Sequence, residues 1–600
     1  MGRTWRPFES LRMPSFWVIF SVLLLLAAIV TLKCLPHDFG GGTLVASLSS
    51  AWQGEFQRTP AGITASEGEA PFGLDIRVQL KRHAKYVFEL ATVDSPPLDL
   101  DFQALGKKSN GVRIEVPATG GESYFVRSVQ WPGLSEECLL LIHAKSDRPV
   151  TISYLRVYEV AELSTKIRWL LKGLLMGAAL MSILSAACLV GGKRLLIAAA
   201  LFVSVLMIYV LFSHCPAGSQ SGDNMWYIPT AQQLLRAGNI NLSQHAELIK
   251  QRDYYGIRNA PRYGLVNFFP MGTSLLALPF VFAGKLIGLD ESQLFKYTAQ
   301  IWAALSVVLI FWLGVRFRLS HFLAGTVALV FGLASSHLSV HAGGLWSHNT
   351  SLLLSLIVVL LLTSDQAQCV LLAAPVAVLG YITRPDFSLL IAGSLVYVGI
   401  RHRDLTVGFL ALLAVSIVPF LIWSYYFFGQ WLPPYYQGGR LNWETWAQAL
   451  TGQLLSPNRG LVIFNPIVIL SFWGMVLAWF NHDEFHSLFR IISLVFLAFV
   501  VTLACFPHWW GGHSYGPRLY SPMLGLLTLS VVPAIHWIKK LKHDTRIAVV
   551  MLCILAIGWG GFVHFRGARA WSVYAWNVDP INVDVKPERS WDWSDMQVFR

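Results

Sequence analysis

Charged residues are scarce in this chain. Only 13% of its 600 residues are Asp, Glu, Lys or Arg, whereas 54% are hydrophobic and the mean hydropathy is +0.52. A soluble domain carries about a quarter charged residues on average. The shortage excludes an ordinary soluble protein and predicts a polytopic α-helical membrane protein, much of whose surface faces lipid.

Paired cysteines are also missing. The seven cysteines form no CxxC pair and show no spacing typical of a metal site. Several of them lie inside apolar runs, where Cys is usually a small buried hydrophobic residue. We therefore expect neither zinc binding nor redox chemistry based on cysteine. The sequence also lacks any evident internal repeat or low-complexity tract.

The net charge of +12 is concentrated at the ends of apolar runs. The basic clusters are Lys193 and Arg194, Arg316 and Arg318, Arg401 and Arg403, and Lys539, Lys540 and Lys542. This distribution follows the positive-inside rule, by which cytoplasmic loops collect Lys and Arg. It accounts for the positive charge without a nucleic-acid partner, so we expect no nucleic-acid binding.

About thirteen apolar runs are candidates for membrane-spanning helices. They lie near residues 15–34, 167–190, 195–213, 296–316, 321–342, 350–364, 369–383, 387–400, 405–428, 463–481, 488–506, 520–538 and 547–563. The first run follows a basic start, as in a signal peptide, but it is long and no A-x-A site follows it. We therefore expect residues 1–35 to hold a cytoplasmic stub and an uncleaved first span.

Residues 36–165 have a different pattern from the apolar runs on either side. Alternating segments such as LDIRVQL and TISYLRVYEV are separated by Gly, Pro, Asn and Asp, which is typical of β-strands. We expect an extracytoplasmic β-sandwich here. A carbohydrate-binding role and a structural or partner-docking role both remain open. The transmembrane domain then covers residues 166–563, and an extracytoplasmic tail covers residues 564–600.

The segment NFFPMGTSLLALPFVFAGKLIG (267–288) decides the predicted topology. It is apolar enough to cross the membrane, but a crossing would place the basic clusters at 401–403 and 539–542 outside, against the positive-inside rule. We therefore expect a juxtamembrane helix with an irregular start at Pro270 and Gly272. It would belong to a set of juxtamembrane helices over residues 223–290.

That topology gathers polar residues from distant loops on the outer face of the membrane. They are Asp223, Arg384, Asp386, Arg459, His508, His513 and Arg518, together with the Trp-rich tail, which we expect to cover a site or lock the outer loops. This convergence is the main functional signal. Asp223 lies at the mouth of a span, where a partly desolvated carboxylate is suited to general-base catalysis. Asp is also a favoured helix N-cap, and the two interpretations are compatible.

Several motifs in the second half of the chain carry a resemblance to a known family. They are Gly222-Asp223 with Tyr227, FPMG (269–272), LWSHNTSLLL (345–354), ITRPDFSLL (382–390), FFGQWLPPYY (427–436), LLSPNRGLVIFNP (454–466) and HWWGGHSYGPRLYSP (508–522). Their order resembles that in GT-C-fold glycosyltransferases that use polyprenyl-phosphate sugars. That class includes protein O-mannosyltransferases and aminoarabinose transferases. The resemblance covers roughly residues 195–600.

The resemblance implies an inverting transfer of a sugar from a polyprenyl-phosphate donor to an extracytoplasmic saccharide, lipid or protein acceptor. Asp223 matches the acid of the family's first outer loop and is the expected catalytic base. Arg384, Arg459 and Arg518 are expected to bind the donor phosphate, because guanidinium groups suit phosphate oxygens. They would also suit the head groups of membrane lipids. The residues expected to bind substrate are Tyr227, His348, His508, His513 and Tyr515.

The chain departs from the family pattern in its second outer loop, where many relatives have a further acid. The segment HAGGLWSHN offers His341 and His348 but no carboxylate. His508 and His513 are five residues apart, which fits neither a helical metal-ligand pair nor a short zinc loop. We expect no cofactor, and a divalent metal remains an alternative.

The expected location is the plasma (inner) membrane of a bacterium, with a multi-pass chain and the active site on the extracytoplasmic face. Two other functions remain open. A transporter or flippase of lipid-linked saccharides predicts ionisable residues in mid-span and internal repeats. A non-catalytic scaffold for envelope assembly predicts that Asp223 is replaceable without loss of function.

Overall fold

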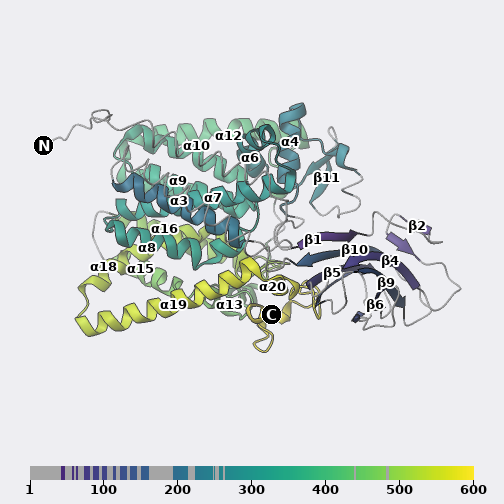
Figure 1. Cartoon of the computed structure of the whole chain (residues 1–600). Helices are drawn as coiled ribbons and strands as arrows, with labels where there is room; N and C mark the ends of the chain where they lie inside the picture. Colours follow the sequence, from purple (N-terminus) through teal and green to yellow (C-terminus); the bar gives the residue numbers. More distant parts are fainter. Residues whose placement is uncertain are drawn as a thin grey trace, which may run out of the picture.

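The structure is a computed structural model of the whole chain (Figure 1). It describes ten strands between Gly42 and Val160, and then residues 193–600 apart from 214–222, 247–248, 250–255, 261–263, 438–440 and 481–484. The spans predicted near 15–34 and 167–190 lie outside the described residues. So do the boundaries of the predicted N-terminal units.

The strands of the N-terminal half pair into two antiparallel sheets. The six-stranded sheet has the order β2-β3-β10-β5-β8, with β1 also paired to β10, and the four-stranded sheet has the order β4-β9-β6-β7. Their bounds are β1 Gly42–Ser47, β2 Gln57–Thr59, β3 Gly62–Thr64, β4 Gly73–Leu80, β5 Lys85–Val93, β6 Leu98–Ala104, β7 Val112–Val116, β8 Glu122–Gln130, β9 Glu136–Ala144 and β10 Thr151–Val160. The β-sandwich remains a prediction, because the two sheets are described only by their backbone pairing.

The rest of the described chain is mostly helical. Its helices are α3 Lys193–Phe212, α4 Tyr227–Ala237, α6 Gly272–Leu286, α7 Glu291–Arg316, α8 His321–Leu333, α9 Ser347–Leu362, α10 Ala367–Thr383, α11 Ser388–Arg401, α12 Thr406–Phe428, α13 Trp446–Leu455, α14 Leu461–Phe464, α15 Val468–Phe480, α16 His486–Ala504, α17 Leu524–Leu529, α18 Val531–Lys540, α19 His543–Arg569 and α20 Trp571–Ala575. A short hairpin of β11 Ile257–Ala260 and β12 Gly264–Asn267 lies between α4 and α6.

Six helical stretches of the described chain are long and apolar enough to cross a membrane, which is the pattern of a multi-pass membrane protein. They are Arg194–Phe212, Glu291–Arg316, Arg403–Phe428, His486–Ala504, Arg518–Lys540 and His543–Arg569. Five further apolar helices have 10–17 residues. The predicted number of about thirteen spans is therefore met only in part, since several apolar runs form shorter helices. The run 321–342, for example, is divided into α8 and a π-helical turn, His337–His341.

The segment 267–288, which decided the predicted topology, forms the end of β12 and then α6. The helix starts at Gly272, directly after Pro270 and Met271, where the sequence predicted an irregular start. Its 15 residues extend about 22 Å at 1.5 Å per residue, whereas the hydrocarbon core of a bilayer is about 30 Å thick. A Cβ on Gly272 would lie only 2.5 Å from Oγ1 of Thr383, so α6 begins in close contact with the end of α10. The side of the membrane on which it lies remains a prediction.

Close packing holds the helical body together. Helices α3, α7, α9, α10 and α16 contribute buried apolar residues to one large core, which includes Val205, Phe311 and Leu356. Polar side chains also join helices: the Tyr209 hydroxyl of α3 donates to the carbonyl of Gly332 in α8 at 2.9 Å. Buried polar groups are stable when they are paired in this way. The packed helices hold in place the loops that carry the candidate site.

A glycine contact between α15 and α18 gives a test of this packing. A Cβ on Gly474 would lie 1.8 Å from the carbonyl oxygen of Ser530, so Gly474→Ala must push the two helices apart. Overpacking of this kind costs about 1–3 kcal/mol. We expect a lower midpoint of thermal unfolding in detergent.

The matched control for this test is Gly399→Ala in α11, where a Cβ would meet nothing within 4 Å. Ala is the better helix former, by about 0.5–1 kcal/mol, so this variant should match or exceed the wild-type midpoint. Equal midpoints for the two variants would contradict the close approach of α15 and α18.

Candidate functional site

An ion pair joins two loops that are 295 residues apart in the sequence. Nη1 of Arg518 donates to Oδ2 of Asp223 at 3.0 Å, and Nη2 donates to the carbonyl of Gly511 at 2.7 Å. The side chain of Arg518 is 9% exposed and that of Asp223 is 31% exposed. Gly511 and Gly512 adopt positive φ angles of 74° and 64°, which favour glycine and turn this loop around the guanidinium.

Arg518 also contacts an aromatic ring, and one of its nitrogen donors has no partner among the described residues. Its guanidinium lies 4.4 Å from the ring centroid of Trp346, a cation–π contact. Its Nε is buried and forms no hydrogen bond with the residues that the structure describes. Arg518 therefore retains one donor for another group.

The alternative role of Asp223 as a helix cap is not what the structure shows. Helix α4 begins at Tyr227, its N-cap is Trp226, and no side chain caps it. Asp223 lies three residues before that N-cap, in the turn that precedes the helix. Its carboxylate is held by Arg518 instead.

Arg384 and Asp386 form a second buried pair. Nε of Arg384 donates to both carboxylate oxygens at 3.1 and 3.0 Å, and Nη2 donates to Oδ2 at 2.7 Å. Nη1 reaches Oγ of Ser347 at 3.3 Å and Nε2 of His348 at 3.4 Å. Burial acts to lower the pKa of Arg384, but the Asp386 carboxylate outweighs it and the pKa is raised, so the guanidinium stays charged.

Tyr227 and His348 connect the two ion pairs. Tyr227 is the first residue of α4, is fully buried, and interacts electrostatically with both Asp223 and Arg384. Burial raises the pKa of Tyr227, so it remains a neutral phenol. His348, in the first turn of α9, lies within electrostatic range of both Arg384 and Arg518. These five residues of the predicted site form one cluster.

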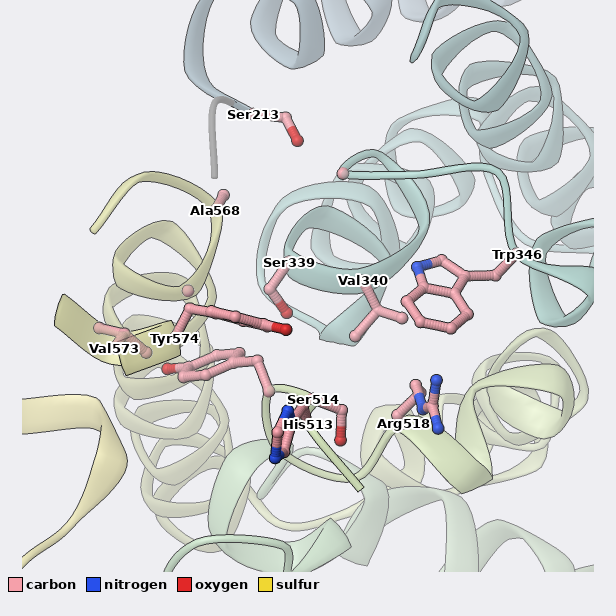
Figure 2. A pocket seen from close by; sticks show the side chains of 13 residues that line it. Ser213, Ser339, Val340, Trp346, His513, Ser514, Arg518, Ala568, Val573 and Tyr574 are labelled. Carbon is pink, nitrogen blue, oxygen red and sulfur yellow. The ribbon is translucent and has the colours of Figure 1, made fainter. Parts of the chain in front are cut away.

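A small recess opens beside Arg518. Figure 2 shows Ser339 and Tyr574 toward one end of it and Trp346 and Arg518 toward the other. The small residues Gly343, Gly567 and Ala568 also line it. Helices α19 and α20, the π-helical turn, the loop before Arg518 and Ser213, which follows α3, all contribute to its walls.

Three residues predicted to bind substrate lie farther along the same loop. His513 and Tyr515 line the recess, but the Tyr515 hydroxyl donates to the carbonyl of Val563 at 2.7 Å. Nε2 of His513 lies 2.8 Å from Oδ1 of Asn582 in the tail. His508 is exposed, and its ring centroid lies 5.1 Å from that of Trp510. These geometries bring His513 and Tyr515 to the recess, whereas His508 lies against Trp510.

Arg459 is saturated by protein contacts. Nε donates to the carbonyl of Trp510 and Nη1 to Asn458 and Gln597, while Nη2 donates to Gly512 and Asn577, at 2.6–3.3 Å. A guanidinium has five N–H donors, so none is left for a phosphate. Burial lowers the pKa of Arg459 to about 9, which still keeps the charge at neutral pH. The surroundings of Arg459 thus favour a structural role over the predicted phosphate-binding role.

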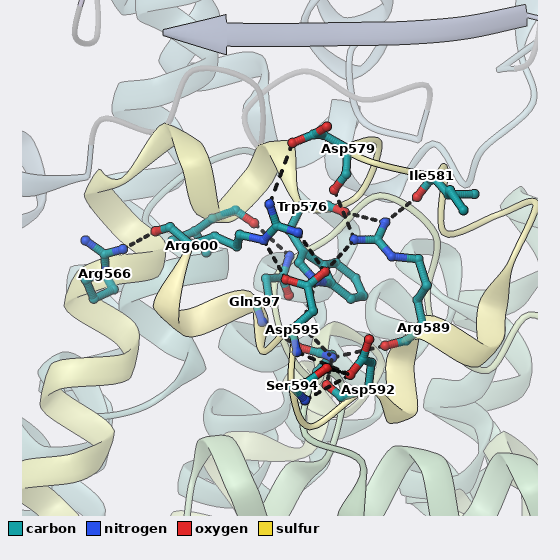
Figure 3. Close-up of polar contacts among 12 residues, drawn as sticks. Arg566, Trp576, Asp579, Ile581, Arg589, Asp592, Ser594, Asp595, Gln597 and Arg600 are labelled. Atoms are coloured by element: carbon teal, nitrogen blue, oxygen red, sulfur yellow. Dashed lines mark hydrogen bonds and ion pairs between the residues drawn. The ribbon is translucent and has the colours of Figure 1, made fainter. Parts of the chain in front are cut away.

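The C-terminal tail supplies two of these partners, Asn577 and Gln597, and is held by polar contacts of its own (Figure 3). Arg589 donates to Asp595 at 2.9 Å and its guanidinium lies 4.5 Å from the ring of Trp576. Gln597 donates to the carbonyls of Ser514 and Val573, both at 3.0 Å. The tail therefore ties the loops around residues 458 and 514 together, an arrangement that fits a lock on these loops.

Some residues of the site were missed by the sequence analysis. Trp346, Ser347, Ser213, Ser514 and Tyr574 belong to the cluster or the recess. Trp346 and Ser347 stand beside His348 in the segment LWSHN, so its polar and aromatic density was a usable signal. Ser213, Ser514 and Tyr574 carry no such signal.

The described residues contain no group of three or more His, Cys, Asp or Glu side chains that could hold a metal ion. His508 and His513 therefore belong to no such group.

Comparisons with known proteins yield a distant structural match. No family model and no curated protein matches the sequence. Among solved structures, the chain is similar to the cryo-EM structure of arabinosyltransferase EmbB from Mycobacterium smegmatis, with a TM-score of 0.33 and 13% identity. The match covers 87% of this chain and 53% of EmbB, so this chain spans about half the length of that protein. A likeness this distant does not assign a function to this chain.

The contacts of Arg459 predict the effect of Arg459→Lys. A lysine keeps the charge but has only three donors, so at least two of the five partners lose their hydrogen bonds, and the planar fork that bonds both Gln597 and Asn577 of the tail is lost. Hydrogen bonds to charged groups contribute about 1.5–3 kcal/mol each. We expect limited proteolysis followed by mass spectrometry to show cleavage within residues 571–600 at least tenfold faster than in the wild type.

Arg490→Lys in α16 is the matched control for Arg459→Lys. The guanidinium of Arg490 is partly exposed and donates to the carbonyls of Ala478 and Trp479. Its replacement should leave the tail resistant to cleavage. An Arg459→Lys tail as resistant as the wild type would contradict the structural role of Arg459.

Proposed function

We propose that this protein is an inverting glycosyltransferase. It transfers a sugar from a polyprenyl-phosphate carrier to an acceptor hydroxyl at the extracytoplasmic face of a bacterial plasma membrane. The observation that carries the proposal is the contact between Asp223 and Arg518 in a multi-helix membrane protein. The order of the motifs, which resembles that in GT-C-fold glycosyltransferases, supports the same reaction.

Asp223 is the proposed catalytic base. Arg518 holds Oδ2 at 3.0 Å and so orients the carboxylate, which is exposed enough at 31% to meet a substrate. The carboxylate takes the proton of the acceptor hydroxyl as its oxygen attacks the anomeric carbon. The bond from that carbon to the phosphate oxygen breaks, and the polyprenyl phosphate leaves with the electron pair.

Arg518 is the residue that we propose for the leaving phosphate. Its charge is partly desolvated, and charge in a dry site stabilises a developing anion more than charge in water does. Arg384 is the second candidate, although Asp386 already neutralises it. Arg459 drops out of the proposed phosphate site, because all of its donors are used inside the protein.

The neighbours of the two ion pairs would position the substrates. Tyr227 is a neutral phenol within electrostatic range of Asp223, and His348 is within electrostatic range of both guanidinium groups. Both side chains are able to bond sugar hydroxyls or phosphate oxygens.

The base assignment is tested by Asp223→Asn. An amide cannot accept the proton, and general-base catalysis contributes about 10²–10⁴-fold to rate. We expect transfer by purified protein in nanodiscs, measured with a panel of polyprenyl-phosphate sugars and acceptors, to fall at least 100-fold. The thermal unfolding midpoint verifies that the variant is folded.

Asp365→Asn is the control for Asp223→Asn, because Asp365 is almost fully exposed between α9 and α10. It should transfer at the wild-type rate. A folded Asp223→Asn protein that also transfers at that rate would refute the assignment. If the protein moves a lipid-linked saccharide across the membrane of a vesicle and forms no glycosidic bond, the result would indicate a flippase instead.

The phosphate assignment is tested by Arg518→Lys. Lysine cannot contact Asp223 and the Gly511 carbonyl with one planar group, and it lacks the guanidinium face that stacks on Trp346. We expect a loss of about 10–100-fold in kcat/KM for the donor, equivalent to about one charged hydrogen bond. Arg401 lies at the exposed end of α11, so Arg401→Lys should change neither kcat nor the KM for the donor. Unchanged kcat and donor KM in Arg518→Lys would exclude the role.

A further inference from the structure

Three exposed tryptophans lie between α12 and the start of α13. Trp431 follows α12, Trp443 lies three residues before α13, and Trp446 is the first residue of α13. Their side chains are 63%, 67% and 49% exposed. Rings of this size carry a large apolar surface, and its removal from water is favourable. We therefore asked what covers them.

The first of these rings continues a surface that faces lipid. Helix α12 is a candidate span, and only three of its 23 residues are buried in the protein. The ring of Trp431 stacks on that of Tyr425 in α12, with centroids 4.9 Å apart. The hydroxyl of Tyr436, five residues on, donates to two carbonyls near the end of α10, just before Arg384. Trp431 therefore lies at the end of the helical body that carries the candidate site.

The other two rings lie at the end of α16, which is also a candidate span. The backbone N–H of Asn442 donates to the carbonyl of Cys505, the residue that follows α16, at 2.6 Å. Trp443 is the next residue after Asn442. Helix α13 has ten residues and extends about 15 Å, roughly half the thickness of the hydrocarbon core of a bilayer. It is too short to cross, so Trp443 and Trp446 lie where α16 leaves the membrane.

Composition indicates which partner covers the rings. Tryptophan and tyrosine collect at the boundary between lipid and water, because their rings are apolar and their N–H or O–H groups are polar. Between residues 422 and 456 the sequence has one basic and one acidic residue, Arg440 and Glu444, which cancel. This segment therefore has no net charge to attract an anionic surface. Its continuity with two spans favours the lipid boundary over a protein partner.

Helix α13 is also in contact with the loop that holds Arg518. A Cβ on Gly452 of α13 would lie 2.3 Å from the ring of Trp509, so the helix and the loop are closely packed. Gly511, whose carbonyl accepts a hydrogen bond from Arg518, is two residues beyond Trp509. Whatever holds α13 in place therefore also supports this loop.

We propose that Trp431, Trp443 and Trp446 lie in the head-group layer of the phospholipid bilayer, and that α13 is an interfacial helix. The bilayer holds α13, and α13 supports the loop that supplies the carbonyl partner of Arg518. The inference concerns where the protein meets the membrane, so it is independent of the proposed transfer reaction.

The first arm of the test identifies what covers the rings. The photocrosslinker p-benzoylphenylalanine replaces Trp431, Trp443 or Trp593, one at a time, in the full-length protein in phosphatidylcholine nanodiscs. Trp593 is the matched control, because it is 59% exposed but lies in the polar tail beside Asp592. After irradiation, intact mass spectrometry should show about fivefold more lipid adduct at Trp431 and Trp443 than at Trp593.

The position of the adduct on the lipid measures depth. Val418 is the second control, because it is exposed within α12 and lies about 15 Å before the end of that helix at 1.5 Å per residue. Fragmentation of the adducts should place the new bond on the glycerol or the first acyl carbons for Trp443. For Val418 it should place the bond deeper in the acyl chain.

The second arm tests the connection between α13 and the Arg518 loop. Trp443→Ser and Trp446→Ser are combined, and amide hydrogen exchange in nanodiscs is followed by mass spectrometry over residues 506–516. Because the bilayer no longer holds α13, exchange in this loop should rise about 3–10-fold. Trp593→Ser should leave the exchange unchanged. The thermal unfolding midpoint verifies that both variants are folded.

Four results would overturn the inference. Equal yields of lipid adduct at Trp443 and Trp593 would show that the rings have no special contact with lipid. A covalent dimer in place of a lipid adduct would show that a second copy of the chain covers them. Adducts that form only with anionic lipids would make charge the basis of the contact. Unchanged exchange over residues 506–516 in the double variant would show that α13 does not support the loop.

Discussion

The buried guanidinium of Arg518 is the group on which the rest of the site depends. A charge removed from water is stable only when it is paired and hydrogen-bonded. Arg518 meets this demand with Asp223 from a loop 295 residues away, with the carbonyl of Gly511, and with the face of Trp346. One desolvated charge therefore fixes three separate segments around one point. It also leaves Nε without a hydrogen bond to the described residues, which is why a structural ion pair is at the same time a candidate reaction centre.

Arg384, Arg459 and Arg518 differ in how many of their hydrogen-bond donors are already used by the protein. This difference separates structural from chemical roles. Arg459 uses all five donors on carbonyls and amides of the protein, so it anchors the tail to the loops. Arg384 is neutralised by its neighbour Asp386 and has a weaker contact with His348. Arg518 alone combines burial, a carboxylate partner and an unsatisfied donor among the described residues. The same residue type thus has different roles, and the role depends on which hydrogen-bond partners each arginine has.

Hydropathy and charge placement predicted the membrane character and the start of the helix after Pro270, because apolar runs and proline act locally along the chain. They also led to the expectation that Asp223 and Arg518 share one face, and the two residues are in contact. The number of spans was less predictable, because a run such as 321–342 is divided by a π-helical turn. The sequence could not predict that protein groups occupy every donor of Arg459, because these partners lie up to 138 residues away. The recess was unpredictable for the same reason: its walls come from five distant segments.

The central claim is that Asp223 and Arg518 form a reaction centre for a sugar linked to a lipid phosphate. The most direct test is a cryo-EM structure of the protein in nanodiscs with a non-transferable polyprenyl phosphonate sugar. The account predicts that the phosphonate lies in hydrogen-bond contact with Arg518, with the anomeric carbon facing the Asp223 carboxylate. A phosphonate bound in a different part of the protein, with the Asp223–Arg518 pair intact and distant from it, would contradict the account.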